Sequence, residues 1–352
     1  MTMPDPPSLH RLDHFPDALL DVPAAGLWRH LPGPTLFDLP GRRGTPLFVT
    51  VLLHGNEVTG WQAIQQILKA NRQQALPRPL LLFVGNVAAA KAGLRTLPGQ
   101  NDYNRVWPGT LFNEAPEAQL MREVTRIASE RQIFASIDIH NNTGHNPHYA
   151  CVNRLAEAHL WLASLFSRTV VYFVRPLGVQ ATAFAGICPS VTVECGRIGT
   201  ASGVAHAAEF LAAALALSHF PEHPVPDGDI DIMQTFAIVR VPHDASVSFN
   251  GVNADFRFRP DLDSLNFSEV EAGTSFGQLG QAATRKLEIV SGGALDVGVE
   301  TGEPLFAYDG GEITLTRRVI PSMLTTDVNA VRLDCLGYLM HRIGRDGGRL
   351  KT

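Results

Sequence analysis

The sequence predicts an α/β domain with a largely parallel sheet and helices on both faces, followed by a smaller β-rich domain. Apolar runs of strand length alternate with helical patterns over the first part of the chain, which is typical of such a sheet. A proline-rich segment at 221–228 then precedes shorter β-prone stretches. The 352 residues, 45% of them hydrophobic, are also more than one core usually organises. We therefore expect domains at 1–222 and 223–352.

The elements of the first domain follow from hydrophobic patterning. Residues 1–45 are rich in proline and loop-like. Five near-continuous apolar runs predict buried strands, at 46–53, 80–84, 133–139, 170–174 and 191–193. Three segments predict helices, at 57–71, 113–130 and 203–217. In the second domain, β-prone stretches lie at 236–241, 313–319 and 331–333, separated by glycine, proline and aspartate turns.

Composition excludes several classes of function. The net charge of -5 gives no basic surface for nucleic acid or for an anionic membrane. The four cysteines form no CxxC pair, which fits a reducing compartment. The acidic, proline-rich amino terminus is unlike a signal peptide, and the most apolar later stretch, 210–217, is too short to span a bilayer. We expect a cytoplasmic protein with a small-molecule substrate and no nucleic-acid or membrane partner; a homo-oligomer is left open.

The first chemical signal is His54-Gly-Asn-Glu57, where a predicted strand turns into a helix. Residues three apart at a helix start share a face, so the imidazole and the carboxylate can reach one metal ion. Ligands of α/β sheets bind beyond the carboxyl ends of strands, which is where this motif lies. An isolated HxxE pair is nevertheless a weak signal.

The second signal, Asp138-Ile-His140, also ends an apolar strand. His140 would complete the set of two histidines and one carboxylate that is typical of catalytic zinc. Asp138, two residues earlier on the same side of the strand, could accept an imidazole N–H and fix the tautomer. The competing interpretation is an ordinary buried Asp–His hydrogen bond.

Glu194 directly follows the apolar run at 191–193 and precedes Cys195-Gly196. At the same sheet edge as His54 and His140, it could take a proton from a metal-bound water and pass it to a leaving nitrogen. A helix-capping or salt-bridged glutamate is the alternative.

The fourth signal is Asn104-Arg105, preceded by Arg95. An amide beside a guanidinium can hold a carboxylate through several directed donors. A second arginine could stabilise the oxyanion that forms when a carbonyl is attacked. Taken alone, these could be surface arginines in a loop.

In their order along the chain, these motifs resemble the succinylglutamate desuccinylase/aspartoacylase family, which is similar to the zinc carboxypeptidases. The resemblance rests on His54-x-x-Glu57, on Asn86 with Arg95, on Asp102-x-Asn104-Arg105, on Asp138-x-His140 with the following Asn-Asn-Thr143, and on Glu194. It covers roughly Phe48 to Gly196, and the β-rich remainder is consistent with that family's carboxyl-terminal domain.

The resemblance implies a zinc-carboxypeptidase-like mixed sheet and one zinc per chain, held by His54, Glu57 and His140. It implies Glu194 as general base and acid, and a zinc-bound water that attacks the acyl carbon. It also implies that Arg95 polarises the scissile carbonyl, while Asn104 and Arg105 hold a substrate carboxylate. The expected activity is hydrolysis of the acyl-amide bond of a small N-acyl amino acid or a related compound, with ester cleavage as a further option.

The sequence departs from the aspartoacylases in two places. The segment 178–188 lacks the tyrosine and arginine that select an aspartyl side chain, so N-acetylaspartate is not the expected substrate. Arg197 stands where a small or neutral residue is expected, and it could contact substrate or be a surface charge. His145 and His148 follow the second histidine ligand closely; loop histidines are the simpler interpretation, although either could touch substrate.

Two other functions compete with deacylation. A zinc carboxypeptidase acting on short peptides would use the same ligands, although its motifs are generally further apart. A binding protein that has lost catalysis would keep the metal pocket, but the presence of Glu57, Glu194 and Arg95 argues against this reading.

Overall fold

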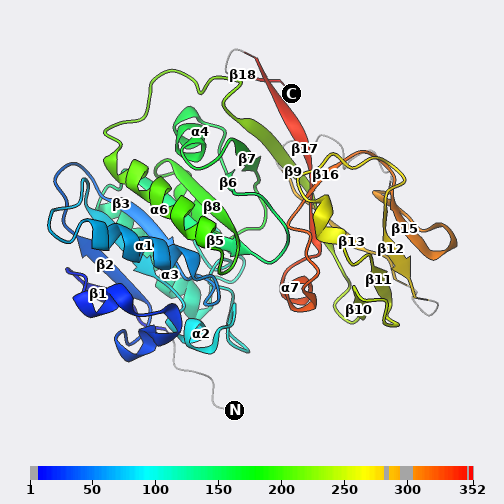
Figure 1. The fold of residues 1–352 in the computed structure, drawn as a ribbon, viewed down its shortest axis with the longest axis horizontal. Coiled ribbons are helices and arrows are strands. Elements are labelled where there is room, and N and C mark those ends of the chain that lie inside the picture. The colour runs from blue at the N-terminus through cyan, green and yellow to red at the C-terminus, as the bar shows by residue number, and fades with distance from the viewer. Residues whose placement is uncertain (1–6, 281–284, 294–303, 347–348, 352) are drawn as a thin grey trace. The chain divides into compact units, whose positions relative to one another are not determined.

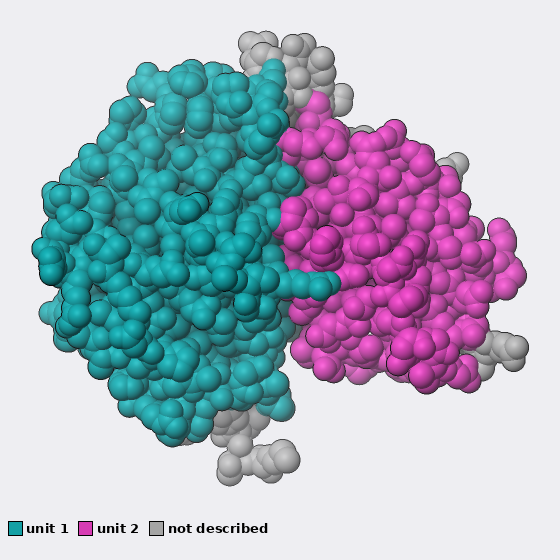
Figure 2. Space-filling view, viewed as in Figure 1, with its two compact units in different colours: residues 1–141, 148–170, 176–230 teal, residues 142–147, 171–175, 231–352 magenta. Residues whose placement is uncertain are grey.

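The structure is a computed structural model that describes residues 7–280, 285–293, 304–346 and 349–351 (Figure 1). The chain divides into two compact units, coloured separately in Figure 2. The first comprises residues 1–141, 148–170 and 176–230, and the second comprises 142–147, 171–175 and 231–352. The domain boundary after residue 222 stays a prediction.

The first unit contains a mixed sheet with helices on both faces. Its strands are β1 (His10–Leu12), β2 (Thr35–Leu39), β3 (Leu47–Val51), β4 (Leu80–Val84), β5 (Ala135–Asn142), β6 (Tyr149–Val152), β7 (Thr169–Tyr172) and β8 (Ser190–Arg197), and the last residues of β5 and β7 pass into the second unit. They lie in the order β1-β2-β4-β3-β5-β8-β6-β7. β3 runs parallel to β4 and β5, whereas β2 is antiparallel to β4 and β6 is antiparallel to β8. The two antiparallel pairs make the sheet mixed rather than largely parallel.

The helices of the first unit lie between these strands in sequence, except for α6, which follows β8. They are α1 (Thr59–Ala70), α2 (Val87–Ala92), α3 (Pro116–Glu130), α4 (Glu157–Ser164), α5 (Gln180–Phe184) and α6 (Ala201–Ala216), with 3-10 turns η1 (Asp17–Asp21) and η2 (Ala24–Arg29) near the start. Residues 1–45 were expected to be loop-like, yet β2 pairs with all five residues of β4. The prolines that flank β2 at 34 and 40 lie outside the paired segment, so they cost no ladder hydrogen bond.

Two helical layers explain why the strands are apolar on both faces. On one face, α3 buries its apolar stripe with Phe48, Leu81 and Phe83 of the sheet. Figure 1 shows α1 and α6 side by side, and these two helices pack against each other. At Gly60, a Cβ would lie 2.9 Å from Val51 and 3.0 Å from Ile139. Glycine therefore lets α1 approach β3 and β5 closely, which brings Glu57 next to the end of β5.

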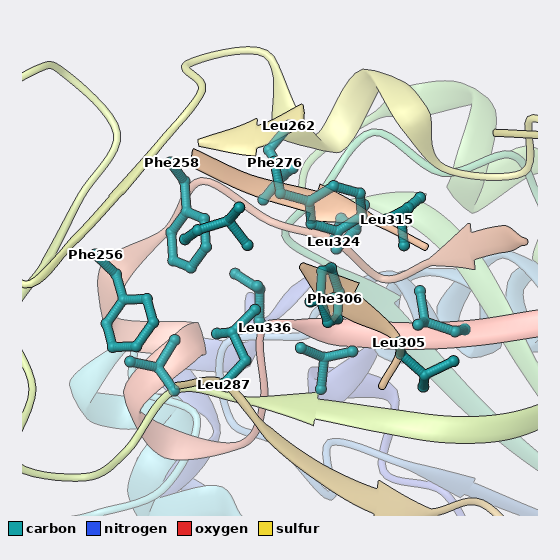
Figure 3. Packing of buried hydrophobic residues seen from close by; sticks show 14 of the residues in the cluster. Phe256, Phe258, Leu262, Phe276, Leu287, Leu305, Phe306, Leu315, Leu324 and Leu336 are labelled. Atoms are coloured by element: carbon teal, nitrogen blue, oxygen red, sulfur yellow. The ribbon is translucent and has the colours of Figure 1, made fainter. Parts of the chain in front are cut away.

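The second unit is β-rich. Its elements are β9 (Asp231–Arg240), β10 (Val247–Ser248), β11 (Phe256–Phe258), η3 (Leu262–Leu265), β12 (Ser275–Leu279), β13 (Glu288–Ser291), β14 (Phe306–Ala307), η4 (Asp309–Gly311), β15 (Glu312–Leu315), β16 (Ile320–Ser322), α7 (Val328–Leu333), β17 (Gly337–Asp346) and β18 (Arg349–Lys351). A five-stranded sheet has the order β10-β11-β12-β15-β14, and β9 pairs with β13 and β17. Figure 3 shows the hydrophobic core of the second unit. In this core the rings of Phe276 and Phe306 meet edge to face, with their centroids 5.2 Å apart.

One expected β stretch is wrong, because residues 331–333 belong to helix α7. The Asp327 carboxylate accepts hydrogen bonds from the backbone N–H groups of Asn329 and Ala330, so it caps the helix start. This local cap outweighs the β-propensity of the three-residue stretch Val-Arg-Leu. No helix in the described part of the chain combines the length and the apolar character that a membrane span needs.

Candidate metal centre

His54, Glu57 and His140 come together as a buried cluster at the carboxyl ends of β3 and β5. One ligand atom from each lies within 4.8 Å of the others. The Nδ1 atoms of His54 and His140 are each 2.7 Å from a Glu57 oxygen and 3.2 Å from one another. The three side chains are at most 5% exposed. The three predicted ligands therefore meet at one point.

The turn that delivers His54 depends on close backbone packing. Leu52 adopts a φ of 56°, which turns the chain out of β3. A Cβ on Gly55 would lie 2.2 Å from the backbone nitrogen of Ala90 in α2. The glycine of this motif is thus required by the approach of α2, since its own φ is not positive.

Two carboxylates orient the imidazoles from outside the cluster. His140 Nε2 lies 2.7 Å from Asp138 Oδ2, and Thr50 donates its hydroxyl to the other Asp138 oxygen. His54 Nε2 lies 3.0 Å from Asp102 Oδ1. A carboxylate at Nε2 favours the tautomer with the proton on that nitrogen, which leaves the Nδ1 lone pair facing inward.

The inner atoms of this cluster suit a cation. Two imidazole lone pairs and a carboxylate converge on one buried point, an arrangement that a divalent metal satisfies. Burial alone would raise the pKa of Glu57, but His54 and His140 hold it well below its usual range. Burial alone would lower the pKa of His140, but Asp138 and Glu57 raise it. The donor set is that of a site for a single metal ion.

Glu194 lies near the end of β8 and is 7% exposed. Its Oε2 is buried and has no hydrogen-bond partner among the described residues. Burial raises the pKa of Glu194 to about 7, a change that Glu57 assists and His140 opposes. This pKa lies near neutrality, as a group that both accepts and donates protons requires.

Arg95, Asn104 and Arg105, the predicted substrate contacts, have different hydrogen-bond partners. Arg95 pairs with Asp102, with Nη2 at 2.9 Å from Oδ2, and its Nη1 is 3.7 Å from Glu57. Asn104 is buried, with Nδ2 3.1 Å from His140 Nε2 and Oδ1 accepting the Gln180 backbone N–H. Arg105 donates to the carbonyl of Asn104.

Arg197, the last residue of β8, is exposed. Arg95 approaches the metal cluster at Glu57, and Asn104 approaches it at His140.

Asp102 is a residue of the metal centre to which the sequence analysis assigned no role. The sequence marks Asp102 only as part of the motif Asp102-x-Asn104-Arg105, yet its carboxylate bridges His54 and Arg95 and also accepts the Asn104 backbone N–H at 2.7 Å. Arg95 and His54 hold the pKa of Asp102 well below its usual range although burial opposes this. Its place two residues before Asn104 was the available signal.

The comparisons with known proteins decide the family. Residues 44–216 match the family model of the succinylglutamate desuccinylase/aspartoacylase catalytic domain. This segment is a catalytic domain of that family. It is a hydrolase of the deacylase type with a buried His-Glu-His metal site, as the motifs predicted. No curated protein sequence matches the chain significantly.

Solved structures of similar fold span most of the chain. Succinylglutamate desuccinylase from Vibrio parahaemolyticus is 14% identical with a TM-score of 0.59, over 89% of this chain and 86% of that one. Murine aminoacylase 3 is 15% identical with a TM-score of 0.55, over 86% of this chain and 97% of that one. The ectoine utilization protein of Ruegeria pomeroyi, in a product-bound structure, is 18% identical with a TM-score of 0.50, over 87% and 88%. These similarities confirm the predicted fold.

Proposed function

We propose that the protein is a zinc-dependent deacylase that hydrolyses the acyl-amide bond of a small N-acyl amino acid. The observation that carries the proposal is the buried His54-Glu57-His140 cluster beside a second buried carboxylate, Glu194, which has an unpaired oxygen. Metal-assisted hydrolysis requires a metal site and a group beside it that can transfer a proton.

Zinc fits the cluster because two neutral imidazoles and one carboxylate form its usual catalytic ligand set, with a further position open. When bound there, zinc acts as a Lewis acid that polarises a carbonyl and lowers the pKa of water. The chain itself sets the ligand geometry, through Asp102 at His54 and Asp138 at His140. Each outer carboxylate accepts the Nε2–H of its histidine and so directs the Nδ1 atom of that ring toward the metal position.

Glu194 is the general base and then the general acid in this proposal. Its carboxylate takes a proton from the attacking water at the unpaired Oε2 and later gives it to the leaving nitrogen. With a pKa raised to about 7, both steps remain accessible near neutral pH.

Arg95, Asn104 and Arg105 supply the polar contacts to substrate. The Arg95 guanidinium is held by Asp102 beside Glu57, and from there it stabilises the negative charge that develops on the scissile carbonyl oxygen. Asn104 and Arg105 bind the carboxylate of the amino acid, because a guanidinium next to an amide provides several directed donors. Arg197 is a further candidate contact, at the exposed end of β8.

A hydrolysis screen tests the proposal. The zinc-supplied protein should release free amine from at least one N-acetyl, N-formyl or N-succinyl amino acid, including N-succinylglutamate, whose desuccinylase shares this fold. Short unblocked peptides form the second arm of the screen. Cleavage confined to C-terminal peptide bonds would favour a carboxypeptidase instead, and no turnover in either arm would reject the hydrolase.

A further inference from the structure

Asn141, the residue after the ligand His140, is a buried link between separate parts of the first unit. Its backbone N–H donates to Glu57 Oε2 at 3.0 Å. Its side-chain Nδ2 donates to the Gly196 carbonyl at 3.0 Å, and its Oδ1 accepts the Thr59 backbone N–H at 3.4 Å. The residue is 4% exposed. One asparagine therefore touches the metal ligand Glu57, the start of α1 and the end of β8.

The side chain and the backbone of Asn141 have separate tasks. Almost any residue could supply the backbone N–H to Glu57, because that contact needs no side chain. The two other contacts need an acceptor toward Thr59 and a donor toward Gly196, and a side-chain amide offers both. The partners also fix the orientation of the amide, since the reverse orientation would set acceptor against acceptor.

The far end of this link lies two residues beyond Glu194. Gly196 has a φ of 71°, and a Cβ there would come within 3.3 Å of the His148 ring. The His148 ring is itself stacked on His206 at 4.8 Å. The end of β8 thus lies close to the His148 imidazole and accepts a hydrogen bond from the Asn141 amide.

We propose that Asn141 is a positioning residue that fixes the strand carrying Glu194 relative to the helix start that carries Glu57. The inference rests on the proposed function, because it assigns Asn141 an effect that passes through Glu194. Misplacement of a catalytic group by about 1 Å can cost on the order of 10²-fold in rate. Losing the amide while keeping the backbone N–H should therefore reduce turnover but spare the metal.

The first test is a double-mutant cycle with zinc-loaded full-length protein. Asn141→Ala should lower kcat by about 10–100-fold with little change in KM, and it should retain one zinc per chain. In a Glu194→Gln background the same substitution should cost less than about threefold, since the group it positions has already been disabled. An equal loss in both backgrounds would overturn the proposal, as would a normal kcat for Asn141→Ala.

Asn71→Ala is the matched control. Asn71 ends the same helix and also donates its side-chain amide to a backbone carbonyl, that of Ile67, at 2.9 Å. Its removal should leave kcat and zinc content at the wild-type level. A similar loss of kcat in this variant would show that general loosening of α1, rather than the Asn141 link, reduces turnover.

Amide hydrogen exchange provides a readout that does not depend on activity. In Asn141→Ala the Thr59 amide should exchange faster than in wild type, whereas in Asn71→Ala it should not. An unchanged Thr59 amide in Asn141→Ala would refute the link even if kcat falls. Absence of turnover by the wild type on every substrate would instead reject the proposed function, and the exchange measurement would still decide whether the link exists.

Discussion

Asp102 offers a sharp test of the site because its two oxygens serve different partners. Oδ1 faces His54 Nε2 at 3.0 Å and accepts the Asn104 backbone N–H, whereas Oδ2 pairs with Arg95. Asp102→Ala removes both sets of contacts. Asp102→Asn can keep an oxygen toward His54 but sets an N–H₂ group against the donors of Arg95. The two variants therefore separate support of the metal ligand from support of the arginine.

The expected magnitudes follow from these contacts. A hydrogen bond to a charged group contributes about 1.5–3 kcal/mol, or roughly 10–150-fold in an equilibrium constant. Asp102→Ala should thus weaken zinc binding by about 10–100-fold, in line with other outer partners of metal-bound histidines. Asp102→Asn should weaken zinc binding by less than about tenfold but lower kcat about as much as Arg95→Ala does.

Competition with a chromophoric chelator measures the zinc affinity, and amine release at saturating zinc measures kcat. Zinc binding by Asp102→Ala within twofold of wild type would refute the role of Asp102 at His54. Equal zinc affinities for the Ala and Asn variants, both strongly reduced, would refute the division between the two oxygens.

Four other predictions concern the metal ligands, the proton-transfer group Glu194 and the substrate contacts. Metal analysis of protein purified without chelator should show about one zinc per chain, and His54→Ala or His140→Ala should reduce it sharply; full zinc content in both variants would exclude them as ligands. Glu194→Gln should keep zinc but lose about 10²–10⁴-fold in kcat. Because the base must be ionised, wild-type kcat/KM should fall as the pH drops below the Glu194 pKa, which burial raises to about 7 and which a bound cation lowers; a flat acid limb would assign the proton transfer to another group. Arg105→Lys should lower kcat/KM by more than about tenfold, since lysine cannot reproduce the guanidinium fork. Substrates with an esterified carboxylate should be poor for wild type but little worse for that variant, and equal wild-type rates for acid and ester would contradict a carboxylate contact.

Much of the fold and the metal ligands could be predicted from the sequence, because burial leaves a strong signature. The run at 80–84 is apolar at every position and forms β4 with these bounds, since a strand covered on both faces needs no polar residues. His54, Glu57 and His140 were recognisable because polar side chains directly after such strands collect at one sheet edge.

The missed features depend on tertiary contacts that have no local pattern. β2 is short and flanked by prolines, and only its pairing with β4 makes it a strand. Asp102 lies in an irregular segment, so its contact with His54 depends on the path of the loop. Nothing in the local sequence distinguishes Asn141 from other asparagines, because its partners Thr59 and Gly196 are far away in sequence. Such roles are visible only once the elements are packed.

The central claim is a single metal ion that serves deacylation, and a zinc titration tests it most directly. Metal-free protein is mixed with increasing zinc, and amine release is followed with the best substrate of the N-acyl amino acid panel. We predict negligible activity without metal and a linear rise that stops at one zinc per chain. Full activity in metal-free protein, or a rise that continues well beyond one equivalent, would contradict the account.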